Sequence, residues 1–111
     1  MSKNNIRLTK KYKDIKKDLL DQLDRNGTVG EYYIDLIDDY MDFYETKTML
    51  IVDIKTKGVS VKYDNGGGQS GYKKNDSVDQ LLKVNAQMLR LLNALGIEPS
   101  GGEDNDDNEE M

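Results

Sequence analysis

The chain has 111 residues and a formal net charge of −5, and it contains no cysteine, histidine or tryptophan. Their absence excludes disulfide bonds, zinc sites built on thiolates, and catalysis by Cys–His or Ser–His–Asp groups. No apolar run approaches the ~20 residues of a membrane span and no apolar leader follows the first methionine, so we expect a soluble protein that is not exported.

Charge is strongly segregated along the chain. Residues 1–17 carry seven basic residues and one acidic residue, whereas residues 18–46 carry nine acidic residues and one basic residue. Residues 100–111 carry six acidic residues and no basic residue. Because the binding of polyanions follows local fields, this pattern matters more than the net charge. We expect a flexible basic arm over residues 1–8, a helical domain over 9–99, and a disordered acidic tail over 100–111.

A first helix is expected from Thr9, as its N-cap, to Asn26-Gly27. Its apolar residues recur at helical spacing on one face, at Tyr12, Ile15, Leu19 and Leu23. Lysines crowd the first two turns and aspartates the last ones, which is the reverse of what the helix dipole favours. The lysines form either a merely solvated face or a binding patch, and the reversed polarity favours the patch.

A second helix of about 28 residues is expected to end at Gly58, with Thr28 and Glu31 forming a capping box at its start. Two neighbouring apolar stripes run along it, one of Leu36, Tyr40, Phe43, Leu50 and Ile54 and one of Tyr33, Ile37, Tyr44 and Ile51. Four aspartates lie on its outward side, and we expect solvated carboxylates there rather than a magnesium site or an acid–base pair. These residues are Asp35, Asp38, Asp39 and Asp42.

A short β-hairpin is expected at about residues 59–74, because residues 59–63 alternate at period two and residues 72–74 can return as a second strand. Residues 64–71 form a glycine-rich loop between them. Gly66, Gly68 and Gly71 satisfy the G-x-G-x-x-G pattern, but no helix opens directly from these glycines. The sequence therefore favours a flexible hairpin tip over a dinucleotide site.

A last helix, capped by Asp76 or Ser77, is expected to end at Gly96 and Pro99. It carries a heptad seam with a polar residue at one of its inner positions, a device that fixes register or partner number. The seam either packs within the protomer or forms an oligomer interface. Its residues are Val78, Leu81, Asn85, Met88, Leu92 and Leu95.

The order of these features resembles a known family. The segment Asp35-Leu36-Ile37-Asp38-Asp39-Tyr40-Met41 leads into a long helix, which is followed by Asn65-Gly66-Gly67-Gly68-Gln69 and by Lys73-Lys74-Asn75-Asp76-Ser77. A helix of the form Leu-x-x-x-Asn-x-x-Met-Leu then ends in Leu95-Gly96-Ile97-Glu98-Pro99. Over roughly residues 19–99 the chain resembles the small subunit of tailed-phage terminases, specifically the terminase-4 family.

The resemblance implies a non-catalytic component of the genome-packaging motor in the host cytoplasm. Such subunits form rings, bind double-stranded viral DNA, and regulate the ATPase and nuclease of the large terminase subunit. The resemblance also implies that the carboxy-terminal end contacts the large subunit, here through Glu103, Asp104, Asp106, Asp107, Glu109 and Glu110. No cofactor or metal is expected. A solubility tail, or a tail that folds back on Lys10–Lys17, remains an alternative.

From the residues themselves, phosphate contacts are expected from the amino-terminal lysines, with the hairpin lysines as second choice. The first group is Lys10, Lys11, Lys13, Lys16 and Lys17, with Lys3 and Arg7 on the arm; the second is Lys62, Lys73 and Lys74. The fold class is mainly α: two amino-terminal helices, the second one long, a short β-hairpin and a carboxy-terminal helix, assembling into a ring. A dimeric transcription regulator and a scaffold protein that does not bind DNA remain alternatives.

Overall fold

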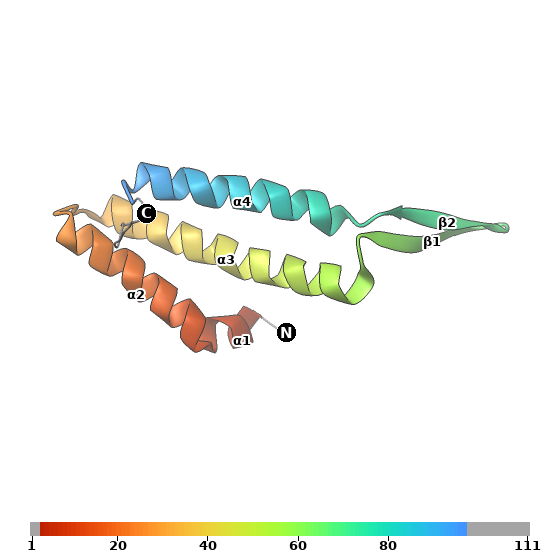
Figure 1. Ribbon diagram of the computed structural model, residues 1–111, viewed down its shortest axis with the longest axis horizontal. Helices are drawn as coiled ribbons and strands as arrows, with labels where there is room; N and C mark the ends of the chain where they lie inside the picture. Colours follow the sequence, from red (N-terminus) through yellow and green to blue (C-terminus); the bar gives the residue numbers. More distant parts are fainter. Residues whose placement is uncertain (1–2, 98–111) are drawn as a thin grey trace, which may run out of the picture.

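The long helix α3 (Glu31–Lys57) is the axis of the structure, which is a computed structural model describing residues 3–97. α4 (Asp76–Ala94) lies antiparallel along one side of α3, and α2 (Lys10–Arg25) lies along another side (Figure 1). The short helix α1 (Lys3–Leu8) precedes α2. A two-stranded antiparallel sheet of β1 (Ser60–Gly66) and β2 (Gln69–Lys74) joins α3 to α4 and projects beyond the helices. The mainly helical class with one hairpin is thus confirmed.

The core lies where α1 and α2 meet the amino-terminal half of α3 and the end of α4. Its buried members come from the first three helices and the segment after α4: Ile6, Tyr12, Leu19, Leu23, Ile37, Met41 and Leu95. Tyr33, Leu36, Tyr40 and Tyr44 of α3 pack around them, so both apolar stripes of α3 are used. None of the helices within residues 3–97 is long and apolar enough to cross a membrane.

The expected basic arm is wrong for residues 3–8, which form α1. Ile6 is only 1% exposed and belongs to the core, so this segment is anchored by apolar burial. Thr9 separates the two helices. Its hydroxyl donates to the carbonyl of Ile6 at 2.8 Å and accepts from the amide of Tyr12 at 3.2 Å, which makes it the predicted N-cap of α2. The folded domain therefore begins before residue 9.

The other helix ends follow the sequence in part. α2 ends at Arg25 with Asn26 as its C-cap, and Gly58 caps the end of α3 with a positive φ of 87°. The prediction of a capping box formed by Thr28 and Glu31 is wrong, because Gly30 is the N-cap of α3 and no side chain makes a capping hydrogen bond there. The prediction of Asp76 or Ser77 as the N-cap of α4 is also wrong. Asn75 is the N-cap, and its side chain accepts a hydrogen bond from the amide of Ser77 at 3.0 Å.

The hairpin is confirmed, but its strands reach further than predicted. Pairing runs from Ser60 opposite Lys74 to Gly66 opposite Gln69 and leaves a two-residue turn at Gly67-Gly68. Both turn residues have positive φ, as a tight primed turn between strands requires, and glycine adopts this conformation without strain. The glycine-rich segment is thus mostly strand and tight turn rather than an open loop.

Replacing Ile6 by Ala tests whether α1 belongs to the folded core. We expect a loss of about 2–5 kcal/mol in the free energy of unfolding, because the change removes a buried side chain and leaves a cavity. Leu8→Ala is the control in the same helix, since Leu8 is 68% exposed and should change stability by less than about 0.5 kcal/mol. Urea unfolding followed by circular dichroism at one protein concentration measures both. Equal effects would contradict the placement of α1.

Candidate nucleic-acid interface

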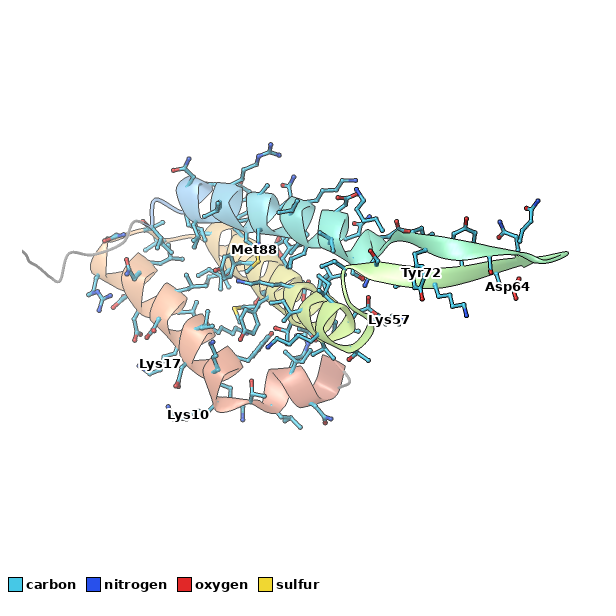
Figure 2. All side chains as sticks on the ribbon, turned by 45° about the vertical axis from the view of Figure 1, so that its right-hand side comes forward. Lys10, Lys17, Lys57, Asp64, Tyr72 and Met88 are labelled. Atoms are coloured by element: carbon cyan, nitrogen blue, oxygen red, sulfur yellow. The ribbon has the colours of Figure 1, made fainter. Side chains whose placement is uncertain are left out.

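Four of the five predicted lysines of α2 lie away from the buried side of the helix, and Lys16 lies at its border with α3. Tyr12, Leu19 and Leu23 occupy the buried side, so their lysine neighbours are directed outward. Lys10, Lys11, Lys13 and Lys17 are exposed, and Lys16 is half-buried. Figure 2 shows Lys10 and Lys17 on the outer edge of the molecule. The predicted lysines therefore line the accessible part of α2 around the helix, and this set of five lysines is here called the α2 lysine face.

Three of these lysines have acidic partners. Lys10 pairs with Asp14 and Lys17 with Asp21 one turn along α2, and the hydrogen bonds to these carboxylates raise the pKa of both lysines. Lys16 lies 3.5 Å from a carboxylate oxygen of Asp38 on α3. Exposed pairs of this kind contribute between zero and about 1 kcal/mol, so a phosphate group can displace the carboxylate. Lys11 and Lys13 have no ion pair with any described side chain.

Arg7 does not belong to this surface. Its guanidinium donates to Asp42 at 2.8 Å, forms an ion pair with Glu45, and lies 5.8 Å from the ring centroid of Tyr12. The hydrogen bond to Glu45 is the largest cause that raises the pKa of Arg7, and the hydrogen bond to Asp42 is the second. Within the protomer this side chain holds α1 to α3, and its role as a phosphate contact stays a prediction. The side chain of Lys3 lies outside the described part.

Glu45 is the feature that the sequence analysis missed. Its side chain is only 2% exposed, one carboxylate oxygen pairs with Arg7, and the other has no hydrogen-bond partner among the described residues. A buried carboxylate of this kind is stable only when it is paired. The available signal was spacing, since Glu45 follows Ile37 and Met41 at successive intervals of four on the same helix face.

The hairpin carries a second basic surface, separate from the α2 lysine face (Figure 2). Lys62, Lys73 and Lys74 are all exposed. Lys62 stands opposite Tyr72, which is 75% exposed, while Lys73 stands opposite Val61 at the adjacent position and therefore projects from the other face. Lys74 pairs with Asp79 at 2.9 Å, and this contact raises its pKa. The structure thus does not bring the two predicted lysine groups together.

One carboxylate fixes the base of the hairpin. Asp53 of α3 accepts hydrogen bonds from Ser77 at 2.7 Å and from Asn75 at 3.1 Å, and its other oxygen pairs with Lys57 at 3.0 Å. Asn75 also donates to the carbonyl of Gly58 at 3.0 Å. The two ends of the hairpin are therefore tied to each other and to both long helices.

The four aspartates in the first half of α3, Asp35, Asp38, Asp39 and Asp42, are exposed, as predicted. Asp38 and Asp42 are engaged by Lys16 and Arg7 in ion pairs between helices. Within residues 3–97, no group of three acidic side chains is placed to hold a metal ion. The structure accordingly uses this acidic surface to contact α1 and α2.

The heptad seam of α4 faces α3 within the protomer. Met88 and Leu95 are buried, and Val78, Leu81, Asn85 and Leu92 are half-buried. Figure 2 shows Met88 between the two helices. Leu82 and Leu89 lie beside the seam instead and remain 64% and 67% exposed. A shallow hollow of about 300 Å³, lined in part by Tyr40, Asn85 and Leu89, opens on this flank.

Comparison with known proteins decides the family. Residues 13–107 match the family described as phage terminase, small subunit, which is most of the chain. The chain belongs to the phage terminase small-subunit family. A search of curated proteins and a search of solved structures returned no match.

Membership of the small-subunit family supports a role in phage genome packaging. The match extends beyond the described residues into the acidic tail, so the large-subunit contacts predicted there lie outside the described part of the chain. Within the described part, the exposed features include the unpaired lysines of α2, the hairpin and the exposed leucines of α4.

The pH dependence of the hairpin base should follow Asp53. Hydrogen bonds from Ser77, Lys57 and Asn75 lower the pKa of this carboxylate from 3.8 to about 2. Because the pKa is lower in the folded state, the contribution of Asp53 to stability is present above about pH 4 and is lost as the pH falls towards 2. Carboxylate NMR shifts of Asp53 should titrate near pH 2. A midpoint near 3.8 would mean that these contacts are not made in solution.

Proposed function

We propose that this protein is the non-catalytic, DNA-binding and ring-forming component of a phage terminase, which recognises double-stranded viral DNA and regulates the large subunit. The observation that carries the proposal is the α2 lysine face on a chain of the small-subunit family. Lysines on an exposed helix can reach phosphates along a duplex, and such contacts supply most of the sequence-independent affinity.

The lysines differ in what DNA binding would require of them. Lys11 and Lys13 are ready to contact phosphate, because no described acid neutralises them. Lys10, Lys16 and Lys17 contribute once a phosphate replaces a carboxylate partner. Lys62, Lys73 and Lys74 remain the second group, at a distance from the first. All eight are lysines, so this set positions the protein on DNA without identifying bases.

Changing Lys11 and Lys13 together to Ala should weaken binding to every duplex. The slope of the logarithm of the binding constant against the logarithm of the salt concentration should become less steep, by roughly 0.9 for each phosphate that the protein no longer neutralises. Fluorescence anisotropy over a range of salt concentrations measures this slope. The control is Lys55→Ala with Lys83→Ala, which removes the same charge from positions outside the α2 lysine face. Its salt slope should stay steeper than that of the Lys11/Lys13 variant. Equal slopes for the two double variants would contradict the assignment to α2.

We further propose that subunit contacts in the ring use the exposed flank of α4. Leu82 and Leu89 are two helical turns apart on one side, next to the hollow formed with α3. A small domain with exposed leucines gains stability by covering them in an oligomer. The partly buried seam residues Val78, Leu81 and Asn85 adjoin this flank and contribute at its edge, whereas Met88, Leu92 and Leu95 support α4 from within the protomer.

Replacing Leu82 and Leu89 by Glu should lower the mass measured by light scattering at micromolar protein concentration, because carboxylates would have to be buried in the contact. Gln80→Glu with Gln87→Glu is the control. It places two new charges seven residues apart on exposed positions of the same helix and should leave the mass unchanged. A monomeric wild-type mass would contradict the ring, and a dimeric mass would favour a transcription regulator.

The acidic tail is proposed to contact the large subunit. Its six acids in residues 103–110 can associate by charge with a basic surface, and such association is fast and sensitive to salt. Deleting residues 101–111 should lower the stimulation of the large subunit's ATPase while DNA affinity stays level. Tighter DNA binding at low salt would instead mean that the tail shields the α2 lysine face. No change in either measurement would leave only a role in solubility.

A further inference from the structure

The α2 lysine face accounts for affinity but leaves sequence recognition without a residue. Lysine contacts to phosphates are the same for every duplex. An arginine can form a paired contact to guanine, but Arg7 is held by Asp42 and Glu45. Arg25 lies at the last residue of α2, two turns beyond Lys17. The remaining exposed element that projects from the helical body is the β1–β2 hairpin (Figure 1).

The hairpin has the dimensions of an element that enters a DNA groove. Its strands have seven and six residues, which at ~3.3 Å per residue makes a ribbon of about 20 Å. Two paired strands fit the major groove of duplex DNA, which is ~12 Å wide. Figure 1 shows no helix beside the outer part of the ribbon, so both faces and both edges are accessible.

The tip is narrow and polar. Gly67 and Gly68 form the turn, and there is open space where a side chain would begin at each of them. Residues 64–70 contain no apolar side chain, and apolar wedges are what minor-groove proteins insert to unstack and kink the duplex. The tip therefore suits entry into the wider major groove without deformation of the DNA.

Two amide side chains flank this turn from opposite strands. Asn65 and Gln69 are exposed, and neither makes a side-chain hydrogen bond to the described residues. Asp64 opposes Ser70 and Gly66 opposes Gln69, so Asn65 is an extra residue in a bulge, which redirects its side chain. The carboxylate of Asp64 accepts from the amide of Gly66 at 2.8 Å and stabilises this bulge. Asparagine and glutamine are the side chains that pair with adenine in the major groove.

The lysines nearer the base lie on the two faces of the ribbon. Lys62 projects from one face and Lys73 from the other, because they occupy adjacent pairing positions. Neither has an ion pair with a described side chain. When the ribbon enters a groove tip first, its two faces turn towards the two phosphate backbones that border the groove. Lys62 and Lys73 are then directed towards one backbone each.

We propose that the hairpin enters the major groove of duplex DNA tip first and that Asn65 and Gln69 recognise adenine there, with Lys62 and Lys73 contacting the flanking phosphates. This inference rests on the proposed DNA binding and adds the element that selects the sequence. Binding by α2 supplies affinity, and the hairpin supplies discrimination.

The test uses the full-length protein and a pool of short duplexes with a randomised centre. Wild-type protein selects a preferred duplex, and the ratio of its affinities for this duplex and a scrambled one is measured. Asn65→Ala with Gln69→Ala should lower this ratio roughly 5- to 150-fold for each adenine that is no longer recognised. The salt dependence should not change, because no charge is removed. Gln80→Ala with Gln87→Ala on α4 is the control and should keep the wild-type ratio.

A second measurement identifies the groove. Replacing adenine by 7-deazaadenine in the selected duplex removes a major-groove acceptor, which should weaken wild-type binding and leave the Asn65/Gln69 variant unaffected. An unchanged ratio in that variant, or a wild-type protein without sequence preference, would overturn the inference while leaving the proposed DNA binding intact. A variant that keeps the ratio but fails to bind the large subunit would make the hairpin a protein-docking element and also overturn it. Failure of the wild-type protein to bind any duplex would remove the proposed DNA binding itself.

Discussion

The two apolar stripes of α3 impose the constraint on which the structure depends. A single helix of 27 residues has apolar side chains on two neighbouring faces, and each face must be covered by another element. α4 covers one face along most of its length, whereas α1 and α2 cover the other face only over its amino-terminal half (Figure 1). The carboxy-terminal half of α3 therefore has cover on one side only. Met49 and Val52 remain partly exposed there.

Charge in this molecule has two uses, and the structure separates them. The ion pairs of Arg7 and Lys16 join α1 and α2 to the acidic outer side of α3. The basic amino-terminal segment and the acidic segment of α3 therefore partly neutralise each other within the protomer. Lysines without such partners remain on α2 and on the hairpin. An electrostatic interpretation based on sequence alone counts both groups as equally available, whereas Arg7 and Lys16 would first have to lose their carboxylate partners.

The sequence predicted the helices and strands whose formation depends on local residue patterns. Helical periodicity placed α2, α3 and α4, glycines placed their ends, and alternation placed the hairpin. It failed for α1, because a six-residue helix gains its stability from the burial of Ile6 and from the pair of Arg7 with Glu45, which is distant in the sequence. Tertiary contacts also decided the cap of α4. Asn75 caps that helix while its side chain also binds Asp53 and Gly58, contacts that no local pattern reports.

For the candidate site, the sequence identified the lysines but not their availability. Spacing alone cannot tell that Lys16 faces Asp38 of α3 while Lys11 faces solvent, or that the heptad seam of α4 is occupied by α3. Leu82 and Leu89 of that helix lie beside the seam, and the heptad pattern does not report that they are exposed. Partner choice depends on the relative placement of elements, which is settled by packing rather than by composition.

The connection of the hairpin to the helices has a mechanical consequence. β1 begins three residues after the end of α3, β2 ends two residues before the start of α4, and Asp53 bridges both junctions through Asn75 and Ser77. Each strand is thus joined to one of the two long helices by a linker of one or two residues. A force on the tip is transmitted along one strand into α3 and along the other into α4, so that bending the ribbon shears the two helices against each other. The α3–α4 interface, with Met88 between the helices, is consequently the part of the molecule that resists such a load.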